Sequence, residues 1–255
     1  MSTSHAEHWA PVHDEFKRWR DAGEHPRLWL RDDDAVAVTP ALQQLMSMCG
    51  SAGVKPLIAT IPATTTAELA DYLAGKAADV AVHGWSHTNH APAGSKAQEF
   101  PVHRPRDEIL RELGQAAARV QVVFGGRGLP MYVPPWNRIA PEVAALLPSL
   151  GYRALSGYGR KSLFAGVSPV VELNTHVDII DWRGTRGGHK ADKPTRDLAD
   201  ALAWSRESGG EPIGILTHHL VHDAQAWRFL EELLVQTGPS SGVHWCSAGE
   251  LLAGR

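Results

Sequence analysis

The chain has 255 residues, of which 43% are hydrophobic and 21% charged, and a formal net charge of −3 at pH 7 with His neutral. This length and composition suit one large folded core, and the slight negative charge without a basic stripe argues against nucleic acid as a partner. The chain has no run of eighteen apolar residues and no apolar segment near its start. We therefore expect a cytoplasmic protein that does not bind membranes, and composition leaves the oligomeric state open.

Helical and strand-like segments alternate along the chain. A helix is expected over 8–22, followed by strands and helices in turn. Prolines and small polar residues mark helix starts, and glycines mark helix ends. Short apolar runs predict the buried strands. The expected strands are 28–33, 56–61, 80–85, 130–134, 152–156, 170–174, 213–218 and 243–246, and the later helices are 41–49, 65–74, 105–124, 142–147, 195–207, 224–236 and 247–252.

Seven or eight strand-then-helix units predict an α/β fold with a parallel sheet. A barrel is favoured over an open sheet because polar residues gather at the ends of many strands, where barrel active sites assemble. No glycine-rich phosphate loop follows the first strand. We expect a single domain over residues 1–255, with residues 1–27 as an N-terminal helical extension.

The strongest local signal is an acidic run, Asp32-Asp33-Asp34, combined with His83 and His87 about fifty residues later. Adjacent carboxylates that follow an apolar strand repel one another and resist desolvation, so a cation would stabilise them. One carboxylate and two imidazoles four residues apart can hold a divalent metal and leave coordination positions open. The sequence therefore predicts a metal site.

Further polar clusters close the later strands: Pro134-Pro135-Trp136-Asn137, Asp178–Asp181-Trp182 and Thr217-His218-His219. Together with the acidic run and the histidine pair, their order resembles the polysaccharide deacetylase family, the NodB-homology domain of carbohydrate esterase family 4. The resemblance covers residues 28 to 250 and implies a distorted (β/α) barrel.

In that family the motif T-F-D-D-G supplies first a general base and then a metal ligand. The resemblance assigns Asp32 as the base and Asp33 as the ligand, and a shift of one residue would assign Asp33 and Asp34 instead. The motif H-[S/T]-x-x-H assigns His83 and His87 as the other two ligands. Gly84 stands where the family has a hydroxyl residue.

The remaining motifs imply the rest of the site. In the family's R-x-P-Y/W motif, Val133 occupies the arginine position, and Arg31 or Arg138 are candidates to replace that arginine. The resemblance assigns His218 as the general acid and Asp181 as the residue that polarises it. It implies substrate contacts at four further residues, which are Pro135, Trp136, Asn137 and Trp182.

The resemblance implies a metal-dependent hydrolase that removes an acyl group from an N-acylated sugar or a related amide. Zinc is the expected ion, with cobalt, nickel or manganese as alternatives. The expected partner is a small-molecule or carbohydrate substrate. Two alternatives stay open: a hydrolase of small cyclic or linear amides on the same barrel, and a catalytically silent carbohydrate-binding homologue.

Overall fold

The structure is a computed structural model, and it describes residues 7–164 and 168–254. Its strands pair in parallel, with helices between them. The chain divides into two compact units. The first contains residues up to 32, 40–56 and 175–247, and the second contains 33–39, 57–174 and the residues from 248 onward. The long strand β1 (Arg27–Ala35) runs from the first unit into the second.

The first unit has the strand order β9-β1-β8-β7. Asp32 on β1 lies opposite Thr217 on β8, so the acidic run begins level with the end of β8. The other strands are β7 (Thr175–Asp178), β8 (Ile213–Thr217) and β9 (His244–Trp245). The helices are α2 (Ala10–Asp21), α3 (Pro40–Ser51), α7 (Asp192–Glu207) and α8 (Ala224–Gln236), with 3-10 turns η4 (His219–Val221) and η5 (Pro239–Ser241).

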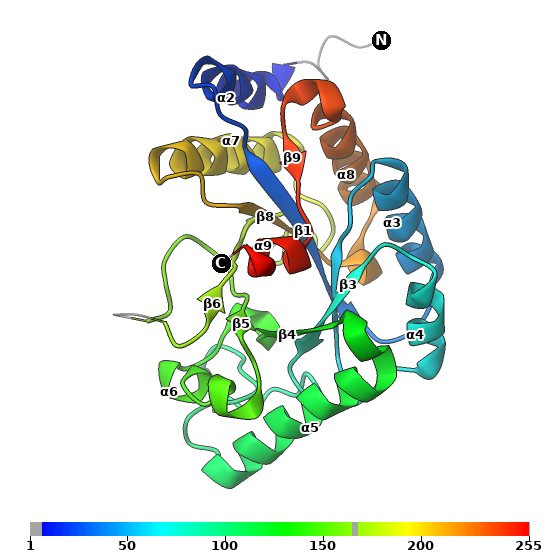
Figure 1. The fold of residues 1–255 in the computed structure, drawn as a ribbon, viewed down its shortest axis with the longest axis vertical. Coiled ribbons are helices and arrows are strands. Elements are labelled where there is room, and N and C mark those ends of the chain that lie inside the picture. Colours follow the sequence, from blue (N-terminus) through cyan, green and yellow to red (C-terminus); the bar gives the residue numbers. More distant parts are fainter. Residues whose placement is uncertain (1–6, 165–167, 255) are drawn as a thin grey trace. The chain divides into compact units, whose positions relative to one another are not determined.

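Helix α2 forms where the sequence predicts it and packs against α7 (Figure 1). Its buried side chains Val12, Phe16 and Trp19 recur at helical spacing and form one apolar face. The indole of Trp19 donates a hydrogen bond to the Leu202 carbonyl at 3.2 Å. The expected N-terminal extension therefore contributes to the core of the first unit.

The second unit has the strand order β6-β5-β4-β3-β2. The end of β1 joins it, because the Ala35 carbonyl accepts hydrogen bonds from Ile61 N at 3.3 Å and Thr60 Oγ1 at 2.7 Å. The strands are β2 (Leu57–Thr60), β3 (Asp79–His83), β4 (Gly128–Val133), β5 (Ala154–Leu155) and β6 (Val171–Glu172). The helices are α4 (Ala67–Ala74), α5 (Arg106–Phe124), α6 (Pro141–Ala144) and α9 (Ala248–Ala253), with 3-10 turns η1 (Gly125–Arg127), η2 (Pro135–Asn137) and η3 (Leu147–Leu150).

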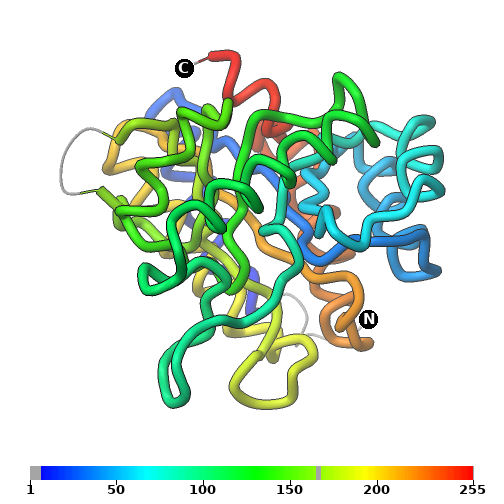
Figure 2. The backbone as a smooth tube through the Cα atoms, turned by 90° about the horizontal axis from the view of Figure 1, so that it is seen from below, coloured from blue at the N-terminus to red at the C-terminus, as the bar shows by residue number. Residues whose placement is uncertain are grey.

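A long loop, residues 84–105, connects β3 to α5, and Figure 2 traces it in blue-green. Arg104 secures the end of this loop. Its guanidinium binds both carboxylate oxygens of Glu112 on α5, at 2.9 and 2.8 Å, and also donates to the Glu99 carbonyl at 3.3 Å. A two-point bond of this kind fixes both distance and orientation. The loop is thus held to a long, well-packed helix.

Every expected strand and helix has a counterpart, but β7 was not expected as a strand. Its sequence Thr-His-Val-Asp alternates polar and apolar residues, and Thr175 and Val177 are buried while His176 and Asp178 are only half-buried. Of this segment, only Asp178 belongs to a polar cluster recognised in the sequence. The single domain over residues 1–255 stays a prediction. Among the described residues, no helix is both long and apolar enough to cross a membrane.

Candidate metal centre and catalytic residues

Three side chains of the second unit form a group that could hold a metal ion: Asp34, His83 and His87. The Asp34 Oδ1 atom lies 3.1 Å from His83 Nε2 and 3.4 Å from His87 Nε2. Ligands placed tetrahedrally about 2.1 Å from a zinc ion would be about 3.4 Å apart, so the spacing suits the ion. Asp34 and His87 are 29% and 22% exposed, and a substrate can therefore approach the group.

The adjacent strand orients His83. His83 ends β3 opposite Val133 on β4, and its Nδ1 hydrogen-bonds the Val133 carbonyl at 3.0 Å. Because that bond requires the proton on Nδ1, it leaves Nε2 as the lone-pair atom that faces Asp34. Val133 stands at the arginine position of the family motif, and here its main chain positions a candidate ligand.

Burial, and then the charge of His83, lowers the pKa of His87 below its usual 6.5. The carboxylates of Asp34 and Glu99 oppose this shift without reversing it. A neutral imidazole is the form that binds a metal, so His87 is ready to act as a ligand at neutral pH.

Glu99 builds the turn between the two histidines. Its buried carboxylate accepts hydrogen bonds from Trp85 N at 3.1 Å and from Ser86 N and Oγ at 2.7 and 3.1 Å. Gly84 has φ +66°, and an added Cβ would overlap this carboxylate and lie 2.6 Å from Pro135 Cγ. The departure from the family motif at Gly84 thus has a steric cause.

Backbone strain is concentrated around the same group. Positive φ angles occur at Asp34 (73°), His87 (56°), Trp136 (55°) and Asn137 (55°), which are four of the five such non-glycine residues in the described chain. Conformations of this kind cost about 1–3 kcal/mol each and tend to occur at functional sites. In the Trp136 turn, the ring lies 4.3 Å from the His87 ring. The predicted substrate residues Pro135 and Asn137 flank Trp136 in η2.

Asp32 lies in a second, closed cluster in the first unit. Its carboxylate accepts hydrogen bonds from Thr217 Oγ1 at 2.7 Å, from His219 N at 2.9 Å and from His219 Nδ1. The side chains of Asp32 and His219 are 0% exposed. Burial raises the pKa of Asp32, but the charge and hydrogen bond of His219 and the Thr217 bond outweigh it and leave the pKa lowered.

These surroundings favour the second register of the acidic motif. A base has to reach the proton it removes, and both Asp32 oxygens are already bonded away from solvent. Asp34, and not Asp33, joins the histidine group. In this register the resemblance gives the place of the base to Asp33, which is itself buried, and the place of the ligand to Asp34.

His218 and Trp182 lie together in the first unit. Their ring centroids are 4.7 Å apart at an angle of 80°, and the Trp182 indole donates to Asp178 Oδ2 at 2.9 Å. His218 is 9% exposed at the end of β8. Trp182 therefore covers one side of the imidazole of His218, the predicted general acid.

Asp181 has other partners than the one expected from the resemblance. Its Oδ1 accepts a hydrogen bond from Gly184 N at 3.0 Å and lies 4.0 Å from His189 Nδ1. These contacts close the turn that follows β7. The structure therefore gives Asp181 a turn-forming role, and its action on His218 stays a prediction.

The two candidate replacements for the family arginine have different surroundings. Arg31 is fully buried on β1. Arg138 is exposed, and its NH1 donates to the Ala97 carbonyl at 3.1 Å. It lines a cavity of about 660 Å³ in the second unit.

The roles of Glu99 and of Thr217 and His219 as partners of Asp32 could not be recognised from the sequence. A single polar residue inside a loop or at a strand end carries no spacing signal.

No family model matches the sequence, and no curated protein matches it. Solved structures do match. A peptidoglycan N-acetylglucosamine deacetylase is 14% identical with a TM-score of 0.61, and the match covers 90% of this chain and 89% of that one. A family 4 acetyl xylan esterase from Clostridium thermocellum, in complex with a cobalt ion, is 13% identical with a TM-score of 0.57 over 89% and 90%. A family 4 carbohydrate esterase from Streptomyces lividans, in complex with acetate, is 14% identical with a TM-score of 0.56 over 87% and 91%.

The chain has the fold of these family 4 deacetylases and esterases. The distorted (β/α) barrel expected from the sequence is thereby confirmed as its fold class. At 13–14% identity the likeness concerns the fold, so activity has to be argued from the side chains of this chain.

Proposed function

We propose that the chain is a metal-dependent hydrolase that removes an acyl group from an N-acylated sugar. The observation that carries this proposal is the group Asp34, His83 and His87, in which two imidazole nitrogens lie within 3.4 Å of one carboxylate oxygen. The fold shared with carbohydrate deacetylases supports a sugar amide as the substrate.

Two imidazoles and one carboxylate suit zinc, and cobalt, nickel or manganese also accept this donor set. When bound, such an ion polarises a carbonyl group and lowers the pKa of water. The residues of the chain provide the other functions. His83 and His87 would hold the ion through neutral imidazole rings. The Val133 carbonyl keeps the His83 ring in place.

In the proposed mechanism, Asp33 removes the proton from the attacking water. The family resemblance assigns proton donation to the departing amine to His218. Trp136, whose ring packs tilted against the His87 ring, provides an aromatic face for the sugar beside the metal group. The products are a carboxylic acid and an amino sugar.

The experiment that tests this function compares two histidines of one loop. Purified protein is stripped of metal and reconstituted with zinc, cobalt, nickel or manganese in turn. Ion content and acetate release from an N-acetylated chito-oligosaccharide are then measured for the wild type, His87→Ala and His90→Ala. His90 follows His87 by three residues and lies outside the metal group.

We expect the wild type and His90→Ala to bind about one ion per chain and to release acetate. His87→Ala should do neither. Failure of the wild type to bind an ion would contradict the proposal. So would equal behaviour of the two variants. Release of ammonia from small amides, in place of acetate from the sugar, would favour the alternative substrate class.

A further inference from the structure

The cavity beside the metal group lies at the ends of three neighbouring strands. It extends over the ends of β4, β5 and β6, and His83 ends the adjacent strand β3. Parallel strands are about 4.8 Å apart, so the near wall of the cavity lies about one strand spacing from His83. A substrate held by the metal group can therefore extend into this cavity.

The same two loops build the metal group and the cavity. The loop 84–105 carries His87 and, eight to eleven residues later, the lining residues Ser95, Lys96 and Gln98. The η2 turn places Trp136 against His87 and continues into the lining residues Asn137 and Arg138. An occupant of the cavity thus touches segments that also position a metal ligand.

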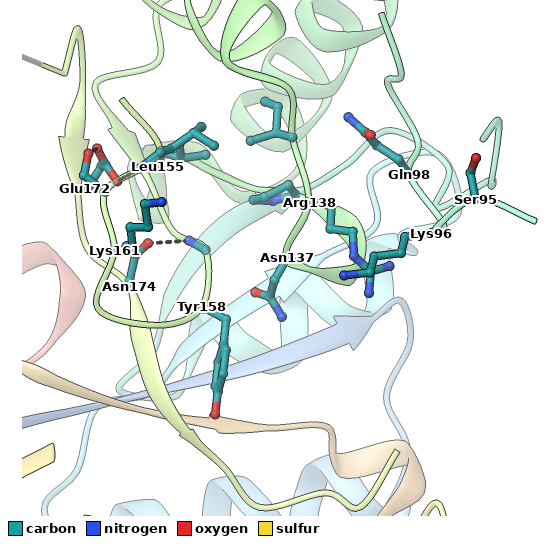
Figure 3. Close-up of a pocket in the computed structure, with 15 residues that line it drawn as sticks. Ser95, Lys96, Gln98, Asn137, Arg138, Leu155, Tyr158, Lys161, Glu172 and Asn174 are labelled. Atoms are coloured by element: carbon teal, nitrogen blue, oxygen red, sulfur yellow. Dashed lines mark hydrogen bonds between the residues drawn. The ribbon is translucent and has the colours of Figure 1, made fainter. Parts of the chain in front are cut away.

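Positive charge dominates the lining. Lys96, Arg138 and Lys161 are its cations, and Figure 3 shows Lys96 and Arg138 on one side and Lys161 on the other, with Asn137 between them. Lys96 and Lys161 have no ion-pair partner among the described residues. A cavity with unpaired cations on opposite sides attracts an anion.

The single carboxylate of the lining, Glu172, is already engaged. It accepts hydrogen bonds from Ser162 Oγ at 2.6 Å and from Leu163 N at 3.1 Å. These bonds stabilise its charge and direct one oxygen to the Ser162 hydroxyl and the other to the Leu163 main chain, both in the loop before β6. The net charge of the lining is therefore positive, with three cations against one hydrogen-bonded anion.

The rest of the lining suits a sugar. The Tyr158 side chain is exposed on the cavity wall and offers an aromatic face. Asn174 accepts a hydrogen bond from Gly157 N at 2.7 Å through its Oδ1, which leaves its amide NH₂ as a donor. A sugar ring with hydroxyl groups and an acidic substituent matches this combination.

We propose that this cavity, the cationic pocket, selects acylated amino sugars that carry an anionic substituent, either a phosphate or a carboxylate. This inference rests on the proposed function of the metal group and specifies its substrate class. Because Lys96 and Lys161 are exposed, their attraction should weaken as salt is added.

Binding is measured first, by calorimetry on the His87→Ala protein, so that it does not depend on turnover. The ligands are N-acetylglucosamine, its 6-phosphate and its 3-O-lactyl ether, which carries a carboxylate. Charged contacts of this kind contribute about 1.5–3 kcal/mol, so we expect at least about tenfold tighter binding of one or both anionic sugars. The anionic sugar that binds more tightly than N-acetylglucosamine identifies the phosphate or the carboxylate as the recognised group.

Lys161→Glu should remove this preference and leave the affinity for the neutral sugar within about twofold, because it changes only the charge that faces the anion. Lys17→Glu on α2 is the matched control and should keep the preference, since Lys17 is exposed outside the pocket. In the wild-type enzyme, kcat/KM for the preferred anionic sugar should exceed that for the neutral sugar by a similar factor at low salt.

Equal binding of all three sugars, or a preference that survives Lys161→Glu, would overturn the cationic pocket. Anion-selective binding without hydrolysis of any of the sugars would instead overturn the proposed function and leave the pocket in place.

Discussion

Asp32 and Asp34 are two residues apart on the same strand, yet their carboxylates have opposite surroundings. Three donors from Thr217 and His219 saturate Asp32, which has no exposure. Asp34 faces the Nε2 atoms of two histidines and keeps 29% of its side-chain surface exposed. Carboxylates on one strand can thus differ sharply in access: Asp32 is enclosed by its donors, while Asp34 can be reached from solvent.

The largest effect on activity is expected from substitution of Asp34. Asp34→Asn removes the negative charge of the side chain proposed to bind the ion. We therefore expect loss of the ion and a fall in kcat of at least about 100-fold. Metal analysis and acetate release measure both effects. Asp71→Asn on the exposed face of α4 removes the same charge and should match the wild type. Retention of the ion by Asp34→Asn would contradict the role of Asp34 as a ligand.

Substitution of the buried Asp32 should lower the stability of the protein. Asp32→Ala leaves the buried donors of Thr217 and His219 without an acceptor, so we expect the free energy of unfolding to fall by about 3 kcal/mol. Thr217→Val, which removes one of the donors, should cost about 1 kcal/mol. Urea unfolding measures both values. A stable Asp32→Ala protein that binds the ion but has no activity would restore Asp32 as the base.

A smaller effect is expected at Glu99, which builds the turn between His83 and His87. Glu99→Gln keeps the side-chain shape but exchanges one carboxylate oxygen for an NH₂ group that cannot accept the Trp85 or Ser86 hydrogen bonds. We expect ion affinity to fall by about tenfold, the usual range for groups that orient metal ligands. Titration with cobalt measures the affinity. Glu142→Gln on the surface is the control, and equal affinities in the two variants would exclude this role for Glu99.

The smallest effect concerns His222, which lies next to the closed cluster. Its ring packs against Trp227 at 4.3 Å, and burial lowers its pKa from 6.5 to about 4. The unfolded chain binds this proton more readily, so stability is complete above pH 6.5 and decreases as the pH falls towards 4. His222→Gln should therefore lose less stability than the wild type between pH 7 and pH 5 in urea unfolding. An equal loss in both proteins would show that His222 is not buried in the neutral form.

Most of the fold could be predicted from the sequence, because buried parallel strands and capped helices leave strong local patterns. Strand β7 could not, because it has only four residues, the lower limit at which polar–apolar alternation indicates a strand. The histidine pair was recognisable from its spacing. The register of the acidic run was not, since three adjacent aspartates are chemically identical and only the partners on other strands distinguish them. Those partners, Thr217 and His219, are nearly two hundred residues away in sequence.

The fit between Gly84 and Glu99 has a consequence for how this site could change. A side chain at position 84 and a carboxylate at position 99 compete for the same space. Substitutions at these two positions should therefore be coupled. Chains built like this one should carry glycine and an acidic residue fifteen positions apart, and chains with a hydroxyl residue after the first histidine should lack the acid.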